Sequence, residues 1–244
     1  MTRNQAAFPA TIAERIHALD WAAVAADLDT RGAATTGPLL TADECRGLAD
    51  LYDDDRAFRS RIVMGRHGFG SGEYKYLAYP LPEAVAELRT SLYRQLAPIA
   101  SRWLARMGQD TVFPEDLAGF LARCHAAGQT RPTPLLLRYA TGDYNCLHQD
   151  LYGATVFPIQ VALLLSDPSS EFTGGEFVLV EQRPRMQSRP EVIGLAQGEG
   201  VIFAVSERPV AGSRGDYRVK MRHGVSRLKS GRRHTLGVIF HDAA

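Results

Sequence analysis

The feature that most limits how this chain can fold is a change of pattern near Pro132. After it, short apolar runs of strand length follow one another, and turn-forming residues such as Thr173-Gly-Gly175 and Gly198-Glu-Gly200 separate them. Many short strands with regularly spaced turns are typical of a β-sandwich or a β-barrel. The expected strands cover residues 135–139, 157–165, 176–180, 200–205, 217–221 and 235–240.

The sequence before this point is mainly helical in pattern. Residues 13–28 are rich in Ala and Leu, and their apolar positions have helical spacing. Thr41 and Glu44 match a capping box, which predicts a helix that continues to about Tyr52. Residues 83–107 have the longest helical pattern, and Pro98 inside it predicts a kink or a split.

A glycine-rich segment, residues 65–79, lies between these expected helices. Its glycines and aromatic residues suit a loop over a pocket, and a plain flexible connection fits them equally well. In the first case His67, Tyr74 and Tyr76 would stack on a ring of a substrate. In the second case these aromatic side chains pack against one another.

The composition excludes several classes of protein. No apolar run is long enough to cross a bilayer, and the N-terminal residues lack the apolar core of a signal peptide, so we expect a cytoplasmic protein. The cysteines Cys45, Cys124 and Cys146 form no CxxC pair, which argues against both a disulfide framework and a zinc knuckle. We expect Cys146 to be a packed small residue, because no base that would activate it is evident.

The charge is unevenly distributed although the net charge is only +1. Residues 181–233 contain twelve Arg and Lys against five Asp and Glu. Such a basic segment fits a polyanion-binding face, and it fits the solvated rim of a sheet equally well. Several of its cations flank His223 in the sequence. The segment includes Arg183, Arg185, Arg189, Arg214, Arg218, Lys220 and Arg222.

The residues with the clearest chemistry are His148 and Asp150. In an extended strand, residues i and i+2 point to one face, so these two side chains can aim a nitrogen and an oxygen at one point. His223, at the end of another expected strand, is the best candidate for a third ligand. Two histidines and one carboxylate leave positions open for a cosubstrate and O2 on Fe(II), although zinc hydrolases use similar sets.

Arg233 favours iron over zinc. On the last expected strand it shares a face with Thr235, and a guanidinium buried there needs an anion, for which a carboxylate is the natural match. A dicarboxylate with a 2-oxo acid at one end can chelate iron and pair with Arg233 at the other end, whereas zinc hydrolysis has no use for this arginine. If the strand register slips by one residue, Arg232 takes this place instead.

At this point the sequence resembles the 2-oxoglutarate/Fe(II) dioxygenase superfamily. The likeness is strongest to the AlkB-type nucleic-acid demethylases, in the segment Arg138-Tyr-Ala-x-Gly-x-x-x-Cys-Leu-His-Gln-Asp150. The whole chain also resembles a group of bacterial oxygenases assigned to the repair of damaged DNA. This wider likeness includes Tyr217-Arg-Val-Lys-Met-Arg-His-Gly-Val225 and the ending Leu236-Gly-Val-Ile-Phe-His-Asp242.

The resemblance implies an α+β protein with a double-stranded β-helix, a cupin-like jelly-roll. It implies one domain over residues 1–244, with mainly helical support from 1–131 and the jelly-roll core in 132–244. It also implies that His148, Asp150 and His223 bind Fe(II), and that Arg233, with Tyr139 and Thr235, binds 2-oxoglutarate. The implied reaction consumes O2, turns 2-oxoglutarate into succinate and CO2, and releases an N-methyl group of a nucleic-acid base as formaldehyde.

The sequence departs from the AlkB type at two positions. Leu137 stands where those proteins usually have Asn, and Ile239 stands where they have a second arginine. The spacing between His223 and Arg233 is closer to that of prolyl hydroxylases. The alternative is therefore a hydroxylase of a protein side chain, an amino acid or a small metabolite. A non-catalytic cupin-like module has no need of both the metal ligands and the arginine.

Overall fold

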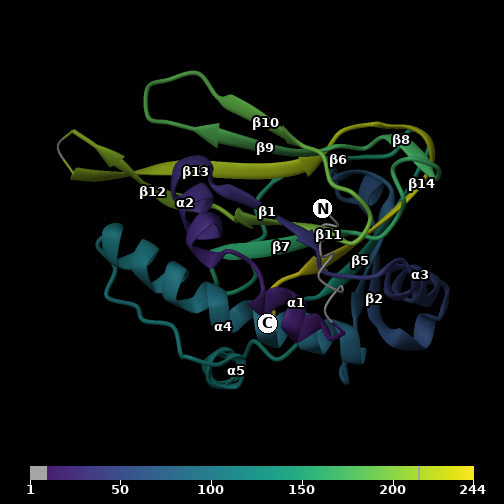
Figure 1. The fold of residues 1–244 in the computed structure, drawn as a ribbon, viewed down its shortest axis with the longest axis horizontal. Helices are drawn as coiled ribbons and strands as arrows, with labels where there is room; N and C mark the ends of the chain where they lie inside the picture. The colour runs from purple at the N-terminus through teal and green to yellow at the C-terminus, as the bar shows by residue number, and fades with distance from the viewer. Residues whose placement is uncertain (1–9, 214) are drawn as a thin grey trace, which may run out of the picture.

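The computed structural model describes residues 10–213 and 215–244, in which two antiparallel sheets face each other (Figure 1). Within these residues the larger sheet has eight strands, ordered β1-β11-β7-β14-β5-β4-β2 with β8 beside β14. Its strands are β1 (Ala33–Pro38), β2 (Phe58–Val63), β4 (Glu73–Leu77), β5 (Leu135–Ala140), β7 (Ile159–Leu164), β8 (Phe172–Gly174), β11 (Glu199–Ala204) and β14 (Leu228–Val238).

The second sheet has six strands among the described residues, ordered β10-β9-β13-β6-β3 with β12 beside β13. Its strands are β3 (Gly70–Ser71), β6 (Tyr144–His148), β9 (Phe177–Gln182), β10 (Arg189–Ile193), β12 (Glu207–Gly212) and β13 (Gly215–Val225). Burial alternates along β13: Val219, Met221 and His223 are buried, while Lys220 and Arg222 are exposed. This period of two places His223 between the sheets and the cations outside.

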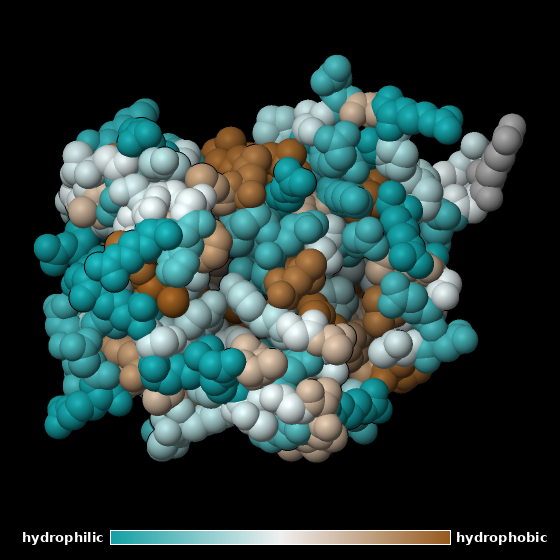
Figure 2. All heavy atoms as spheres, turned by 180° about the vertical axis from the view of Figure 1, so that it is seen from behind, coloured by the Kyte–Doolittle hydropathy of each residue, from teal (hydrophilic) through white to brown (hydrophobic). Residues whose placement is uncertain are grey.

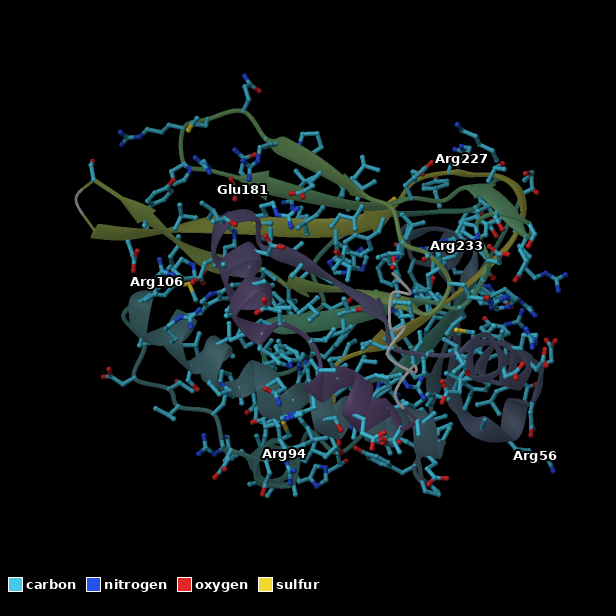
Figure 3. The ribbon with its side chains drawn as sticks, viewed as in Figure 1. Arg56, Arg94, Arg106, Glu181, Arg227 and Arg233 are labelled. Atoms are coloured by element: carbon cyan, nitrogen blue, oxygen red, sulfur yellow. The ribbon has the colours of Figure 1, made fainter. Side chains whose placement is uncertain are left out.

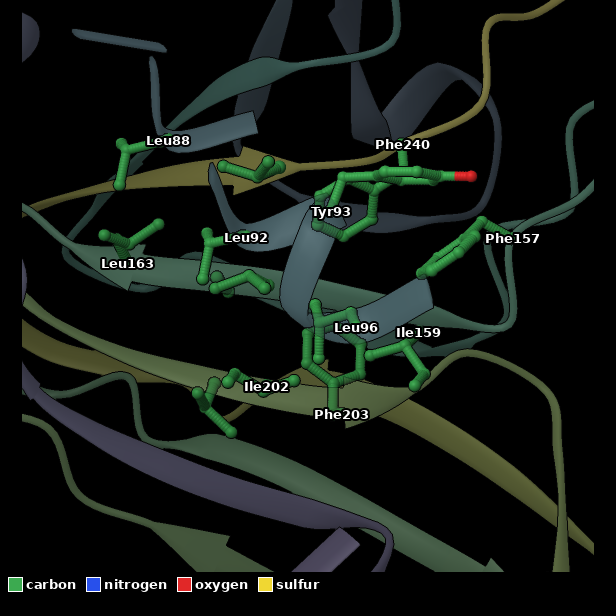
Figure 4. Packing of buried hydrophobic residues seen from close by; sticks show 14 of the residues in the cluster. Leu88, Leu92, Tyr93, Leu96, Phe157, Ile159, Leu163, Ile202, Phe203 and Phe240 are labelled. Atoms are coloured by element: carbon green, nitrogen blue, oxygen red, sulfur yellow. The ribbon is translucent and has the colours of Figure 1, made fainter. Parts of the chain in front are cut away.

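The helices are α1 (Ile12–His17), α2 (Trp21–Arg31), α3 (Ala42–Asp50), α4 (Glu83–Arg106) and α5 (Leu117–Ala126). In Figure 1, α4 runs below the larger sheet, whose strand β7 is buried along its whole length. Figure 4 shows Tyr93 of α4 packed against Phe157 and Phe240, with ring centroids 5.2 and 6.0 Å away. Burial of each such side chain contributes about 1.5–3 kcal/mol.

A buried ion pair ties α4 to the end of β14. Arg89 donates to the backbone carbonyls of Ile239 and Phe240 and to the carboxylate of Asp242, the last at 2.8 Å. Both charged side chains are almost completely buried. Because the guanidinium also satisfies two main-chain oxygens, this contact fixes the helix along the sheet rather than merely neutralising a charge.

The helical predictions hold in part. The capping box at Thr41 and Glu44 is confirmed, and the helix ends at Asp50. The single helix predicted over 13–28 is wrong, because Asp20 caps a new helix and divides the segment into α1 and α2. Pro98 does not split α4, since it lies on the exposed side, where the carbonyl left without a partner can be hydrated.

The first half is not only helical support. β1, β2 and β4 lie in the larger sheet, and β3 pairs with β6 in the second sheet. The glycine-rich segment therefore contains two strands, β3 and β4, and Tyr74 of β4 lies opposite Leu137 of β5. Strands from both halves of the sequence thus share the sheets that enclose the site.

The surface seen from behind is mainly hydrophilic or neutral, with several small separate hydrophobic clusters (Figure 2). No helix in the described part of the chain is long and apolar enough to cross a membrane.

Candidate active site

The three predicted ligand side chains lie together between the two sheets. His148 at the end of β6 is directly opposite His223 of β13, and their ring centroids are 4.2 Å apart. The Nε2 atoms of His148 and His223 lie 3.5 and 3.3 Å from the two carboxylate oxygens of Asp150. All three residues offer a ligand atom within 4.8 Å of the others. This geometry allows one small cation to bind to all three.

The environment keeps these groups in the form that binds a metal. Burial alone would raise the pKa of Asp150, but the hydrogen bond with His223 and the nearby imidazoles hold it well below its usual range. Burial lowers the pKa of His223, which favours the neutral ring with a free lone pair. An ionised carboxylate and a neutral imidazole are the states in which these side chains coordinate metals.

Tyr152 supports Asp150 and was missed in the sequence. Its hydroxyl donates to Oδ1 of Asp150 at 2.7 Å, and its ring packs edge-on against Tyr76 at 6.2 Å between centroids. Burial and the charge of Asp150 raise the pKa of Tyr152, so the phenol keeps its proton. With Oδ1 engaged, Oδ2 of Asp150 remains free to face His223. The only available sequence signal is the i+2 relation between Asp150 and Tyr152.

We expect Tyr152→Phe to weaken metal binding by about 10- to 100-fold, because the carboxylate loses the hydrogen bond that orients it. Anaerobic titration with Fe(II) or Co(II) measures the dissociation constant directly. Tyr79→Phe is a matched control, since the Tyr79 hydroxyl bonds to Asp242 and does not contact the ligands. Equal metal affinity in the two variants would contradict this role of Tyr152.

A cavity of about 200 Å³ extends from the ligands between the sheets. Its walls are mostly apolar, with a few polar groups that point inward. Among the residues that line it are Phe69, Tyr74, Tyr139, Gln160, Arg233 and Thr235.

Arg233 lies at one end of this cavity, between the two sheets, whereas Arg227 is exposed at the rim (Figure 3). Arg233 is only 3% exposed, and it donates to the Thr235 hydroxyl at 2.6 Å. Among the described residues no carboxylate lies within ion-pair distance of Arg233. Gly175 gives it room: with φ at +67°, a side chain there would be strained, and its Cβ would lie 3.0 Å from Cδ of Arg233.

The register question between Arg232 and Arg233 is resolved by the sheet. Arg233 is opposite Tyr139 and points into the cavity, while Arg232 is exposed. The Tyr139 hydroxyl is buried and has no hydrogen-bond partner among the described residues. Burial raises the pKa of Tyr139 to about 12, so it remains a hydrogen-bond donor. A buried cation beside an unpaired donor suits a carboxylate.

The residues therefore fit both an iron ion and a dicarboxylate cosubstrate. The ligand group combines two imidazoles with one carboxylate, which suits Fe(II) with positions open for other ligands. At the other end, Arg233, Tyr139 and Thr235 offer donors to an anion.

Other residues singled out in the sequence have mixed outcomes. Tyr74 lines the cavity, while the ring of Tyr76, which is not among the lining residues, packs at a right angle against that of Tyr74. His234, the neighbour of Arg233, packs against Tyr52 and does not line the cavity. The prediction that Cys146 is packed is wrong, because it is exposed.

The comparison by sequence gives a family and two relatives. The family model Oxygenase-NA, described as an oxygenase catalysing oxidative methylation of damaged DNA, matches residues 72–243. Two uncharacterized proteins of Mycobacterium tuberculosis, from strains CDC 1551 and H37Rv, are 53% identical over 192 residues. The matches cover 78% of this chain and 82% of each relative.

Solved structures share the fold at low identity. A Pseudomonas putida prolyl-4-hydroxylase is 16% identical with a TM-score of 0.56, covering 92% of this chain and 100% of its own. An oxidoreductase of the 2OG-Fe(II) oxygenase family from Burkholderia pseudomallei is 16% identical with a TM-score of 0.51, covering 92% of both chains. The predicted cupin-like fold class is thus confirmed at the level of the mixed α/β architecture with antiparallel sheets.

Proposed function

This chain belongs to the Oxygenase-NA family of oxygenases, and from that premise we propose that it removes alkyl groups oxidatively from nucleic-acid bases. It is an oxidoreductase, a 2-oxoglutarate/Fe(II)-dependent dioxygenase, with Fe(II), 2-oxoglutarate and O2 as its cofactors. The proposal takes residues 1–244 as one catalytic domain, because strands that precede residue 132 lie in both sheets.

In this proposal His148, Asp150 and His223 hold the iron, which when bound supplies the oxidising chemistry with O2. Arg233 pairs with the distal carboxylate of 2-oxoglutarate, and Tyr139 and Thr235 add hydrogen bonds. An N-methylated base, O2 and 2-oxoglutarate give the demethylated base, formaldehyde, succinate and CO2. The apolar cavity walls exclude water from the reacting groups. The single observation that carries this account is the buried Arg233, unpaired with any described acid, in the same cavity as the ligand group.

The mouth of the cavity supports a base as the substrate. Phe69 lines the cavity yet is 47% exposed, and the ring of His67 stacks on it at 5.3 Å between centroids. The backbone of Phe69 accepts a hydrogen bond from Cys146 at 2.9 Å, which fixes this ring beside the strand that carries His148. An unpaired or flipped base can stack on such an exposed ring.

Part of the basic segment is available for phosphate contacts. Arg183 and Arg189 lie within ion-pair distance of Glu181, which also pairs with the buried Arg208. Arg214 lies outside the described residues. Lys220 and Arg222 are exposed on β13 and have no acidic partner among the described residues. These two cations lie on the outer face of the strand that carries His223, and they favour binding of a nucleic-acid backbone across that face.

Binding of a methylated single-stranded oligonucleotide is expected to weaken steeply as salt rises, because bound phosphates release counterions. Lys220→Ala with Arg222→Ala should lower the slope of log affinity against log salt by roughly 1 to 2. The slope is measured by fluorescence anisotropy, with Lys229→Ala compared with Lys220→Ala alone as a control of equal charge change. Absence of binding, or a flat response to salt, would refute a nucleic-acid substrate.

The alternative is hydroxylation of a protein side chain, an amino acid or a small metabolite. Two features favour it: Leu137 lines the cavity, and Ile239 is buried and apolar where AlkB-type proteins have an arginine. One solved structure with a similar fold is, by its name, a prolyl-4-hydroxylase, and hydroxylation of proline belongs to this class of reaction. Turnover of a peptide or amino acid without turnover of an oligonucleotide would select this alternative.

A further inference from the structure

One polar side chain in the cavity is assigned neither to the metal nor to 2-oxoglutarate. Gln160 of β7 is only 4% exposed and lines the cavity beside the ligand group. Its amide oxygen Oε1 is buried and has no hydrogen-bond partner in residues 10–213 and 215–244. Burying an amide oxygen without a partner is unfavourable, so a group that enters the cavity is the natural source of its hydrogen bond.

The sheet register places Gln160 far from the 2-oxoglutarate end. Leu164 of β7 is opposite Thr235, so Arg233 is level with position 166. Positions 160 and 166 are about 20 Å apart along an extended strand. Gln160 itself is opposite Phe203, whose ring lies 4.6 Å from that of His223. Gln160 therefore lies at the metal end of the cavity, across from Arg233.

The chemistry of the unpaired atom points to the primary substrate. Oε1 is an acceptor and needs an N–H or O–H donor, whereas ionised 2-oxoglutarate offers only acceptor oxygens. The neighbouring walls are apolar, since Phe203 and Ala162 line the same region. A base with an exocyclic amino group would supply the donor, and glutamine is a common partner of such a group.

We propose that Gln160 is a specificity residue that accepts a hydrogen bond from the exocyclic amino group of the alkylated base. This inference rests on the proposed function, because it concerns the substrate of the same site. It predicts a preference for methylated adenine or cytosine, which carry an amino group, over N-methylated thymine, which offers a carbonyl at that edge.

The test compares Gln160→Met with the wild-type enzyme on three oligonucleotides that differ only in the methylated base. Methionine keeps the length of the side chain and removes the amide. The KM for the adenine and cytosine substrates should rise roughly 10- to 100-fold, and the KM for the thymine substrate should change little. The dissociation constant for 2-oxoglutarate should stay unchanged. Gln197→Met is the control, since Gln197 bonds to the Leu165 carbonyl outside the cavity.

Three outcomes separate the possibilities. Equal KM values in the wild type and Gln160→Met on every substrate overturn the proposal, provided thermal unfolding shows that the variant is folded. A weakened 2-oxoglutarate affinity with unchanged substrate KM also overturns it and moves Gln160 to the cosubstrate. If only a peptide or amino acid is turned over, the base assignment for Gln160 fails together with the proposed function. The 2-oxoglutarate measurement does not depend on that outcome.

Discussion

His148→Ala is expected to abolish stable iron binding, because it removes one of the three proposed protein ligands. The measurement is the iron content of protein loaded anaerobically with Fe(II) and then freed of unbound metal. The same loss is expected for His223→Ala, whose imidazole lies opposite His148 in the sheet. His148 is half-buried at the end of β6, so the fold of His148→Ala should persist. The ring of His223 packs on the core ring of Phe203 at 4.6 Å, so thermal unfolding is measured alongside for His223→Ala.

His17→Ala is the control for this measurement, because His17 is exposed on α1 and lies outside the ligand group. It should retain the iron content of the wild type. An unchanged iron content in His148→Ala would refute the ligand assignment, whatever activity the variant has.

Arg233→Ala is expected to raise the dissociation constant for 2-oxoglutarate by roughly 100-fold, which corresponds to about 3 kcal/mol for lost charge-assisted hydrogen bonds. Titration of the iron-loaded protein with 2-oxoglutarate in the absence of O2 measures it. The effect on iron content should be small, because Arg233 is at the other end of the cavity from the ligands.

Arg232→Ala provides a matched control for this prediction. It removes the same charge from the neighbouring position, but its side chain is exposed and outside the cavity. The dissociation constant of Arg233→Lys for 2-oxoglutarate should lie between those of the alanine variant and the wild type, since an ammonium keeps the charge but not the bidentate geometry of the guanidinium. An unaltered dissociation constant for 2-oxoglutarate in Arg233→Ala would assign the carboxylate contact to another residue.

The six strands expected after residue 132 overlap β5, β7, β9, β11, β13 and β14, because their apolar runs are continuous and glycine marks many of their turns. The strands β6, β8, β10 and β12 were not in that set, because they are short or carry polar residues and proline. The strands before residue 132 could not be predicted so well. β1 contains Thr35 and Gly37, and β2 contains Arg59 and Arg61, so neither has a strong strand pattern. These segments become strands because they extend an existing sheet at its two ends. Tertiary pairing therefore decides their structure, and local propensity does not.

Within the site, the sequence predicts the residues whose chemistry is unusual for their position. His148 and Asp150 follow from the two-residue period of a strand, and Arg233 from its face shared with Thr235. Tyr152 and Gln160 were missed because neither residue type marks a site by itself. Their roles depend on a 2.7 Å contact with Asp150 and on the pairing of β7 with β11, which only the fold reveals.

The central claim is tested most directly by supplying the iron-loaded protein with 2-oxoglutarate, O2 and a panel of methylated oligonucleotides, peptides and amino acids. Succinate and formaldehyde are then quantified. The account predicts equimolar succinate and formaldehyde with a methylated oligonucleotide, and neither product from His148→Ala. Succinate and formaldehyde formation that is no greater with any oligonucleotide than without substrate would contradict it.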